Sequence, residues 1–469
     1  MRKIASPLDV RLGVIPILIF GLWLWWANFN ARGLFLDEAN LARNIAELSW
    51  REFFGPLKYD QYAPPLYCLL LKGLGECLGY DEFVLRLPAG IGGLMTIAGL
   101  WMGGKRLGLG GWLVVPIAFC FVSPLALRYI GELKPYALDM GIAALLIAWA
   151  LGKPKPSWWY TPIGIVLIWL SFPAVFSIAS AGIYLLLTER KHRLKWLAIG
   201  STWIVGFLAL YLVLLKSEST DSNLQNFHNE FFFPWRFWTL EAWIKAGKLS
   251  LIPLKHGFGF TVLAQVASGL TIVWLLISSK KSDRPIIALL LGPYLLAVGA
   301  SVIGKYSLIP RLMLFSFPGL WLLAGWGWRL QQEQLNGYWK WLPPAVVLMM
   351  IPATNVMRHY RSPLYVGQVR EMLMNLPDDR PAYVDKWAVP AVRYYQEIHR
   401  PRLGPNVTFI YCVNGCEVTE LEPPYSLLFS MQTSPDVNRR IDLILDELDT
   451  DTTTATPHLY FRGQIIEVE

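Results

Sequence analysis

Long apolar runs alternate with short polar loops along the first three-quarters of the chain. An apolar run of about twenty residues is long enough to cross a bilayer as a helix. The first run, 13–29, lacks a small-residue cleavage site, which indicates a retained span rather than a removed signal peptide. The predicted spans are 13–29, 84–102, 112–127, 136–151, 158–171, 173–187, 196–215, 260–278, 286–303, 309–328 and 341–354. The pattern therefore predicts a mainly α fold, a polytopic bundle of about eleven transmembrane helices.

Beyond residue 357 the pattern changes to that of a small soluble α/β domain. Short β-branched and aromatic runs predict strands at 382–385, 407–411, 426–429 and 459–468. Helical periodicity predicts helices at 388–398 and 435–448. Two domains are expected: a transmembrane domain over 1–356 and a soluble domain over 357–469. A purely docking or stabilising role and a direct functional role both remain open for the soluble domain.

Composition places the chain in the membrane class. Hydrophobic residues make up 54% of it and charged residues only 16%, where a soluble protein carries about a quarter charged residues. Many of the 22 tryptophans flank the apolar runs, as in interfacial aromatic belts. The formal net charge is +8, but much of the Lys and Arg lies in short loops between spans. The basic charge therefore does not indicate nucleic-acid binding.

Loop charges predict how the bundle is oriented. Alternate loops are rich in Lys and Arg, and the loops between them are poor in these residues or long. Because basic loops stay in the cytoplasm, the N-terminus is expected inside and 357–469 outside, in a multi-pass protein of the plasma (inner) membrane. The basic loop residues are Arg2, Lys3, Arg11, Lys105, Arg106, Lys153, Lys155, Arg190, Lys191, Arg193, Lys195, Lys280, Lys281, Arg284, Arg329 and Lys340.

Three segments are expected on the opposite, extracytoplasmic side. The first, 30–83, mixes aromatic residues with charges, which is typical of helices lying in the plane of the interface. The second, 128–136, is short and dense in polar groups. The third, 216–258, begins polar and becomes aromatic and basic, which predicts a mobile loop leading into another interfacial helix.

Two adjacent carboxylates, Asp37 and Glu38, follow the first apolar run. Carboxylates are costly in hydrocarbon, so at the end of a membrane helix they are either solvated caps or working groups. In one interpretation Asp37 is the N-cap of a helix over 38–50. In the other, the pair carries chemistry at the membrane surface.

Further motifs follow this pair: Gln61-Tyr62-Ala63-Pro64-Pro65-Leu66-Tyr67, Leu85-Arg86-Leu87-Pro88 and Glu132-Leu133-Lys134-Pro135-Tyr136-Ala137-Leu138-Asp139. With these motifs in this order, the chain from about residue 20 to 324 resembles the GT-C class of membrane glycosyltransferases, which use a polyprenyl-phosphate sugar as donor. The similarity is closest to the bacterial branch related to protein O-mannosyltransferases and lipid A aminoarabinose transferases. It implies a GT-C-like bundle and an inverting transfer of one sugar to an acceptor outside the cytoplasm.

The resemblance also implies roles for single residues. Asp37 matches the position of the catalytic base, and Glu38 would orient the acceptor or hold the loop. Lys134 matches the basic residue that contacts the donor phosphate, and Glu132 would supply a second carboxylate facing the cavity. The other candidates for substrate binding are Tyr136, Arg128, Arg311, Tyr62 and Gln61.

The chemistry of such a donor requires the same residue types. A sugar phosphate already has a good leaving group, so its transfer needs a base for the acceptor hydroxyl and fixed positive charge for the departing phosphate. Asp37 is a candidate base, and Lys134 with Arg311 or Arg128 could hold the phosphate. An interfacial anchor is the alternative role for Arg311.

No cofactor is expected to be required, although a divalent metal remains possible. The chain has no Gly-rich phosphate loop and no Cys/His cluster. It carries Tyr62-Ala63 where aminoarabinose-transferase relatives carry Glu-Lys, so neither a metal site nor a shared substrate follows from the resemblance. Cys412 and Cys416 flank a turn, and a disulfide between them is an open alternative outside the cytoplasm.

The expected partners are a polyprenyl-phosphate-linked sugar, the lipid bilayer, and an acceptor that is a cell-envelope lipid, a glycan or a protein. No nucleic acid is expected. The alternative function is a transporter or flippase of a lipid-linked glycan. That alternative predicts charges near the bilayer midplane and a repeat between the halves of the chain. The sequence shows neither pattern, because its outer-side charges cluster at one face.

Overall fold

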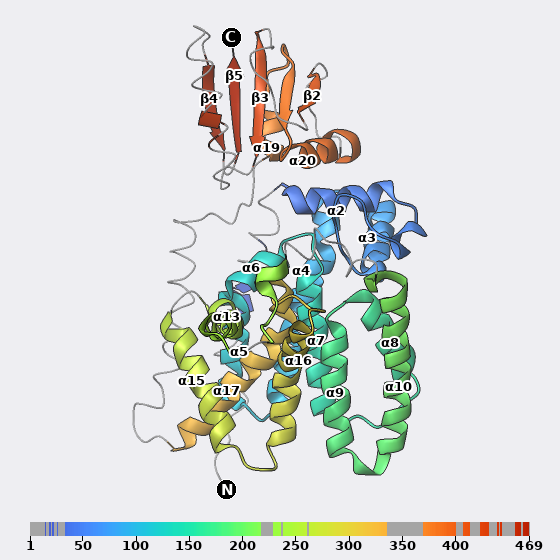
Figure 1. Ribbon diagram of the computed structural model, residues 1–469, viewed down its shortest axis with the longest axis vertical. Helices are drawn as coiled ribbons and strands as arrows, with labels where there is room; N and C mark the ends of the chain where they lie inside the picture. The colour runs from blue at the N-terminus through green and yellow to red at the C-terminus, as the bar shows by residue number, and fades with distance from the viewer. Residues whose placement is uncertain are drawn as a thin grey trace.

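The computed structural model describes residues 33–216, 228–235, 238–259, 262–334, 369–399, 407–412, 423–430, 455–460 and 463–468, with a few single residues near 15–26 and 439–442. These residues form a tall bundle of helices that carries a small sheet domain at one end (Figure 1). We call this end of the bundle the sheet-domain end. The predicted spans 13–29 and 341–354, the polar stretch 217–227 and the predicted helix 435–448 lie largely or wholly outside the described residues.

Helices account for most of the described chain. Each predicted span from 84–102 to 309–328 coincides with one or more helices, and the predicted range 136–151 is matched residue for residue. The described helices outside the sheet domain are α2 (Leu36–Glu47), α3 (Pro65–Leu78), α4 (Glu82–Arg106), α5 (Val114–Val122), α6 (Pro124–Ile130), α7 (Tyr136–Leu151), α8 (Tyr160–Leu170), α9 (Ala174–Thr188), α10 (Arg193–Leu210), α13 (Leu240–Ser250), α14 (Ile252–Gly257), α15 (Val262–Ser278), α16 (Arg284–Val302) and α17 (Phe317–Gln334).

Several of these helices suit a membrane. In the described part of the chain, α4, the Arg190–Leu215 helix and α16 are each long and apolar enough to cross a bilayer. Two bent helix pairs, Gly110–Val122 with Pro124–Ile130 and Leu240–Gly257 with Val262–Ser278, pass the same test when each pair is counted as one span. The mostly helical, membrane-type fold is therefore confirmed. The number of spans stays a prediction.

The range 112–127, predicted as one span, contains a bend. The chain bends by 66° between α5 and α6. Pro124 cannot donate the amide hydrogen that would continue the first helix, so it begins the second one. The Ser123 hydroxyl caps α6 by accepting a hydrogen bond from the Ala126 amide at 3.3 Å. The bend turns the chain toward the loop that precedes α7.

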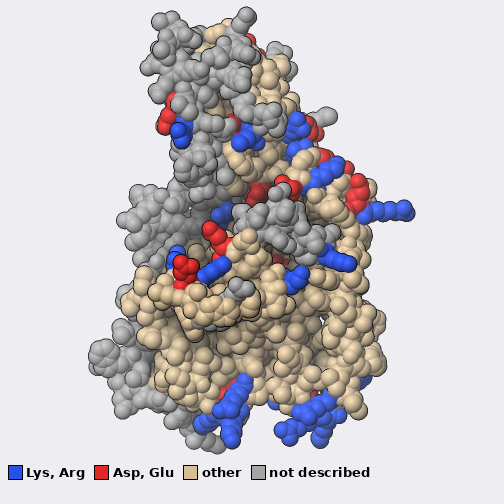
Figure 2. Space-filling view, viewed as in Figure 1, with Lys and Arg blue, Asp and Glu red and all other residues tan. Residues whose placement is uncertain are grey.

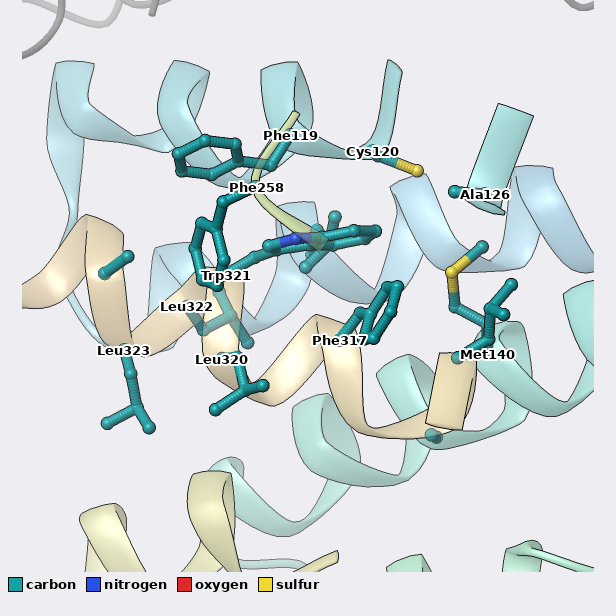
Figure 3. Packing of buried hydrophobic residues seen from close by; sticks show 14 of the residues in the cluster. Phe119, Cys120, Ala126, Met140, Phe258, Phe317, Leu320, Trp321, Leu322 and Leu323 are labelled. Carbon is teal, nitrogen blue, oxygen red and sulfur yellow. The ribbon is translucent and has the colours of Figure 1, made fainter. Parts of the chain in front are cut away.

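The centre of the bundle is packed around α17. Trp321 of this helix is fully buried, and its indole N–H donates to the backbone oxygen of Gly257 at 2.8 Å (Figure 3). Phe119 of α5 meets Phe258 edge to face, with ring centroids 4.7 Å apart. The buried indole is thus satisfied without water, and aromatic contacts join α5, α14 and α17.

Helices α4 and α7 approach each other closely because small residues line their contact. A methyl group at Gly99 of α4 would lie 2.5 Å from the carbonyl carbon of Ala144 on α7. A methyl group at Gly92 would lie equally close to the backbone of Ala137. Small residues allow such backbone contact between membrane helices. The contact fixes the start of α7, and with it the loop 131–135, against α4.

The sheet domain contains a five-stranded sheet in the order β2-β1-β3-β5-β4. β1 is parallel to β2 and β3, whereas β5 is antiparallel to β3 and β4. The α/β prediction is confirmed, but the single strand predicted over 459–468 is wrong, because this stretch belongs to the β4–β5 hairpin. The strands are β1 (Ala382–Asp385), β2 (Phe409–Cys412), β3 (Tyr425–Ser430), β4 (Ala455–Tyr460) and β5 (Gly463–Val468).

Two short helices, α19 (Val369–Met374) and α20 (Val389–Arg393), lie on the side of the sheet that faces α2 (Figure 1). A π-helical turn, Tyr394–His399, continues α20. Cys412, at the end of β2, is disulfide-bonded. Cys416 lies outside the described residues, as do most residues of 335–368, so the domain boundary at 356 stays a prediction.

Charged side chains are distributed unevenly along the bundle. Lys and Arg gather at the end opposite the sheet domain, and a broad band almost free of charge separates them from mixed charges near α2 and α3 (Figure 2). The basic turn Arg190–His192 between α9 and α10 belongs to the set of loops that is predicted to be cytoplasmic. The uncharged band is what a helical bundle presents to hydrocarbon.

Candidate active site

Asp37 and Glu38 lie in the first turn of α2 at the sheet-domain end. The helix begins at Leu36 with Phe35 in the N-cap position, so the interpretation of Asp37 as the N-cap is wrong. Carboxylates in a first turn interact favourably with the positive end of the helix dipole. The two side chains differ in access: Asp37 is 43% exposed, whereas Glu38 is 1% exposed. Only Asp37 is open to a substrate.

Glu38 is a buried anchor for three segments. Its carboxylate accepts hydrogen bonds from Arg86 Nε at 3.1 Å and Arg86 Nη2 at 3.2 Å. It also accepts from the Leu133 amide at 2.7 Å and the Phe35 amide at 3.3 Å. Arg86 in turn donates to the backbone oxygen of Gly33 at 3.1 Å. The start of α2, helix α4 and the loop before α7 therefore meet at this ion pair. Of the two predicted roles of Glu38, the geometry favours holding the loop.

Lys134 lies on the loop between α6 and α7 and is buried. Its ammonium group donates to Gln61 Oε1 at 2.8 Å, which joins the first and second predicted outer segments. Burial lowers the pKa of Lys134, and the Asp37 carboxylate acts in the opposite direction. Lys134 and Asp37 are thus electrostatic neighbours, although they come from different segments. Gln61, a predicted substrate-binding residue, contacts Lys134 in this structure.

Arg311 reaches the same place from a later part of the chain. It lies in the 3₁₀ helix η6 (Pro310–Ser316), directly before α17. Its Nη1 atom is 3.9 Å from Asp37 Oδ2, and Tyr129 and Tyr136 are electrostatic neighbours of its guanidinium. The side chain is 31% exposed. Arg311 therefore places an accessible positive charge beside the accessible carboxylate.

Arg128 and Glu132 form an ion pair at the edge of this cluster. Arg128 Nε is 2.6 Å from Glu132 Oε1, one helical turn apart in sequence. Arg128 is partly exposed, but the Glu132 side chain is buried. The predicted role of Glu132 as a carboxylate facing the cavity stays a prediction; in this structure its carboxylate is paired with Arg128. The partly exposed Arg128 side chain lies at the edge of the cluster.

Two predicted tyrosines complete the surroundings. Tyr136, the first residue of α7, packs edge to face on Tyr129 with ring centroids 4.9 Å apart. Tyr62 is half-buried beside Gln61, just before α3 begins at Pro65 with Pro64 as its N-cap. Both rings lie next to a polar residue of the cluster in sequence or in space. Their positions suit contact with a substrate and add no charge.

A metal site is not evident in the part of the chain that the structure describes. No group of three or more His, Cys, Asp and Glu side chains lies close enough together there to hold a metal ion. Of the carboxylates in the cluster, Glu38 and Glu132 are both paired with arginines. Two cavities, of about 170 and 250 Å³, lie elsewhere in the bundle, and none of Asp37, Lys134 and Arg311 lines either of them.

One important residue, Arg86, was not given a role from the sequence. It is 1% exposed and paired with Glu38, and it stands in an otherwise apolar helix turn. A charge in such a place is itself a signal, because an unpaired charge is costly there. The signal identifies a buried pair but not its partner. Tyr395 contacts the Leu34 amide just before α2, and Glu82 contacts Tyr395. Neither residue carried a comparable signal in the sequence.

Comparisons with known proteins yield solved structures alone. No protein-family model matches the chain, and no curated protein matches it. The solved structures that match include ArnT from Cupriavidus metallidurans bound to undecaprenyl phosphate, at 13% sequence identity and a TM-score of 0.48, with 98% of each chain covered. The apo state of the same ArnT matches at 15% identity and a TM-score of 0.47, with 97% of each chain covered. Both matches extend over nearly the whole length of the chain, at low sequence identity.

Proposed function

We propose that the protein is an integral-membrane glycosyltransferase that moves one sugar from a polyprenyl-phosphate carrier to an acceptor at the sheet-domain end. One observation carries this proposal: an accessible carboxylate, Asp37, lies 3.9 Å from the accessible guanidinium of Arg311, with the buried ammonium of Lys134 as its electrostatic neighbour. A base and two cations thus meet where an apolar bundle ends. Transfer from a lipid-linked sugar phosphate needs this combination.

The proposed reaction is a single displacement. The acceptor hydroxyl oxygen forms a bond to the anomeric carbon while the bond from that carbon to the phosphate oxygen breaks. The hydroxyl proton passes to the Asp37 carboxylate, and the bonding electron pair leaves on the phosphate. Arg311 and Lys134 stabilise the charge that develops on the departing phosphate. Direct displacement inverts the anomeric configuration, because no covalent enzyme intermediate intervenes.

Exposed aromatic residues in the predicted outer segments suit a polyprenyl tail. Trp50 and Phe54 are exposed in the first outer segment, and Trp235 and Trp243 in the third. The third segment is tied to the η6 region, because the Leu308 amide donates to the Phe231 oxygen at 3.0 Å. Aromatic rings of this kind are enriched where protein meets the membrane interface. A lipid-linked donor can therefore enter from the bilayer.

Transport of a lipid-linked glycan is the alternative function. Transport sites lie near the bilayer midplane and carry buried charges there. The charged cluster around Asp37 lies instead at the sheet-domain end. Even Asp139, a buried carboxylate of α7, stands in the first turn of that helix, at the same end. The placement of charge favours chemistry at one face over passage through the bundle.

Mass spectrometry of cell-envelope lipids, glycans and proteins from cells with and without the protein tests the function. We expect a mass difference of one sugar that depends on the protein. The purified protein in nanodiscs should then transfer that sugar from undecaprenyl phosphate and release the free carrier phosphate. Identical envelopes, together with protein-dependent flipping of a lipid-linked glycan in vesicles, would favour the transporter.

The proposal places the sheet domain outside the cytoplasm, as the loop charges predict. A cysteine at Leu459, which is 77% exposed on β4, should react with an impermeant thiol reagent in intact cells. The background should carry Cys77→Ser, because Cys77 is a free, exposed thiol. Lys281→Cys, in the basic loop before α16, is the matched control and should react only after permeabilisation. The opposite labelling pattern would place the site on the cytoplasmic face.

Lys134 is expected to stabilise the leaving phosphate. Lys134→Ala should lower kcat/KM for the donor by the equivalent of about 2–4 kcal/mol, as for loss of one preorganised charge-stabilising group. Lys134→Arg should keep part of the activity. Because burial lowers the pKa of Lys134 below 10.5, wild-type activity should fall at alkaline pH as the amine loses its proton. Lys134→Arg should move that decline to higher pH, since arginine stays charged.

Lys72→Ala is the matched control for Lys134→Ala. Lys72 and Lys134 are equally buried, at 8% exposure, but Lys72 lies in α3 and donates to the Ala46 backbone oxygen at 3.0 Å. Lys72→Ala should therefore leave kcat/KM for the donor unchanged. Wild-type turnover in Lys134→Ala would show that Lys134 only holds its loop against Gln61.

A further inference from the structure

The sheet domain contributes a hydroxyl group that holds the residues just before α2, next to the candidate site. Tyr395, in the π-helical turn after α20, is fully buried. Its hydroxyl accepts a hydrogen bond from the Leu34 amide at 2.7 Å and donates to Glu82 Oε1 at 2.8 Å. Burial raises the pKa of Tyr395, so the hydroxyl keeps the proton that it donates to Glu82. One side chain of the sheet domain thus joins the turn before α2 to the first residue of α4.

This contact leaves no spare room. A methyl group at Gly33 would lie 2.7 Å from the Tyr395 hydroxyl oxygen and 3.1 Å from Arg370 Cβ. Arg370, on α19, pairs with the same carboxylate, with its Nη1 atom 3.3 Å from Glu82 Oε1. The turn at residues 33–35 is therefore enclosed by the sheet domain on one side. Small displacements of that domain must move the turn or break these bonds.

The Glu38–Arg86 pair holds the same turn from the other side. Arg86 donates to the Gly33 oxygen, and Tyr395 accepts from the Leu34 amide, so successive backbone groups are held by different domains. Glu82 and Arg86 are one turn apart on α4 and lie on one face of it. Asp37 follows the turn by two residues. The orientation of Asp37 toward Arg311 consequently depends on both the Tyr395 hydrogen bond and the Glu38–Arg86 pair.

We propose that Tyr395 is a positioning residue for sugar transfer: its hydroxyl fixes the turn at residues 33–35 on α4 and thereby fixes Asp37 relative to Arg311. This inference rests on the proposed function and gives the sheet domain a part in it. Without the hydroxyl, the Leu34 amide and Glu82 lose a buried partner, which is costly and loosens the turn. A role in docking alone is the alternative.

The neighbouring residue, Tyr394, distinguishes a positioning role of Tyr395 from a role in docking alone. Tyr394 is as buried as Tyr395, packs against it with ring centroids 5.1 Å apart, and also bonds the membrane part. Its hydroxyl donates to the Tyr80 oxygen at 2.6 Å, just before α4. Tyr394→Phe therefore removes an interdomain hydrogen bond of the same kind without touching the turn that leads to Asp37.

Full-length protein in nanodiscs carrying Tyr395→Phe or Tyr394→Phe tests the proposal. Tyr395→Phe should lower kcat about tenfold to hundredfold with donor KM nearly unchanged, as expected for loss of a buried hydrogen bond that matters at the transition state. Tyr394→Phe should keep kcat within about twofold of the wild-type value, even if it lowers the unfolding temperature as much as Tyr395→Phe does. Gly33→Ala, which crowds the Tyr395 hydroxyl, should reproduce the Tyr395→Phe kinetics.

Hydrogen exchange supplies a readout that does not require activity. Amides of residues 33–38 should exchange faster in Tyr395→Phe than in wild type or Tyr394→Phe. Equal loss of kcat in both tyrosine variants, or unchanged exchange at 33–38 in Tyr395→Phe, would overturn the positioning role. Exchange at residues 33–38 could be faster only in Tyr395→Phe while the wild-type protein transfers no sugar. That result would support the role of Tyr395 in holding the turn and would remove glycosyl transfer as the function.

Discussion

Asp37→Asn is expected to lower the rate of sugar transfer by about 10²–10⁴-fold, because it removes the general base while keeping the size of the side chain. The protein should still fold and insert, since Asp37 is partly exposed and makes one long ion pair, to Arg311 at 3.9 Å. Donor binding should be nearly normal. Single-turnover transfer and donor affinity, measured on purified protein in nanodiscs, separate the chemical step from binding.

Asp60→Asn is the matched control. Asp60 is an exposed carboxylate of the same outer segment, at a positive φ of 52° that asparagine also tolerates. The substitution removes the same charge from the same loop and should leave transfer unchanged. Transfer by Asp37→Asn at close to the wild-type rate would remove the base assignment and leave Asp37 as a first-turn carboxylate of α2.

Arg86→Met is expected to cause the largest loss of stability, about 3–5 kcal/mol, because it leaves the buried Glu38 carboxylate without its countercharge. Both side chains are 1% exposed, so water cannot replace the lost partner. Glu38→Gln should be costly for the same reason, since it leaves the Arg86 charge buried. Chemical unfolding in detergent, followed by tryptophan fluorescence, measures the loss.

The double variant Glu38→Gln/Arg86→Met should regain much of this stability, because no buried charge remains unpaired. It should not regain full transfer activity, since Gly33 and Leu133 lose charged partners that hold them. Glu76→Gln is the control: Glu76 is 44% exposed and pairs with Lys72 at 3.7 Å, and an i,i+4 helix pair with an exposed carboxylate is worth about 0.5 kcal/mol or less. Equal effects of Arg86→Met and Glu76→Gln would contradict the buried-anchor interpretation.

Local signals were enough to predict much of the fold. The apolar run 136–151 lies between Pro135 and Gly152, and α7 begins and ends as these breakers predict. The strand at 382–385 was likewise predicted correctly from a short aromatic and β-branched run. The break at Pro124 was missed because apolar residues continue on both sides of it. Apolar periodicity alone does not distinguish one span from a bent pair.

The candidate site could be predicted only in part. The sequence identified Asp37, Lys134 and Arg311, and the structure brings these charges together. It could not pair Glu38 with Arg86, because these residues are 48 positions apart and meet only through packing of α2 on α4. Tyr395 was unpredictable for a further reason: it occupies an ordinary position in a helical pattern, and nothing local to it indicates a partner in the membrane part.

Leu34 and its acceptor Tyr395 are 361 positions apart in the chain. At a synthesis rate of about 5–20 residues per second, the ribosome makes the hydroxyl roughly 20–70 seconds after the amide that it holds. A nascent chain therefore carries Asp37 long before the turn ahead of it is secured. Chains truncated before residue 395 should keep an unsecured turn, so that complete synthesis and delivery of the last domain become a condition for activity.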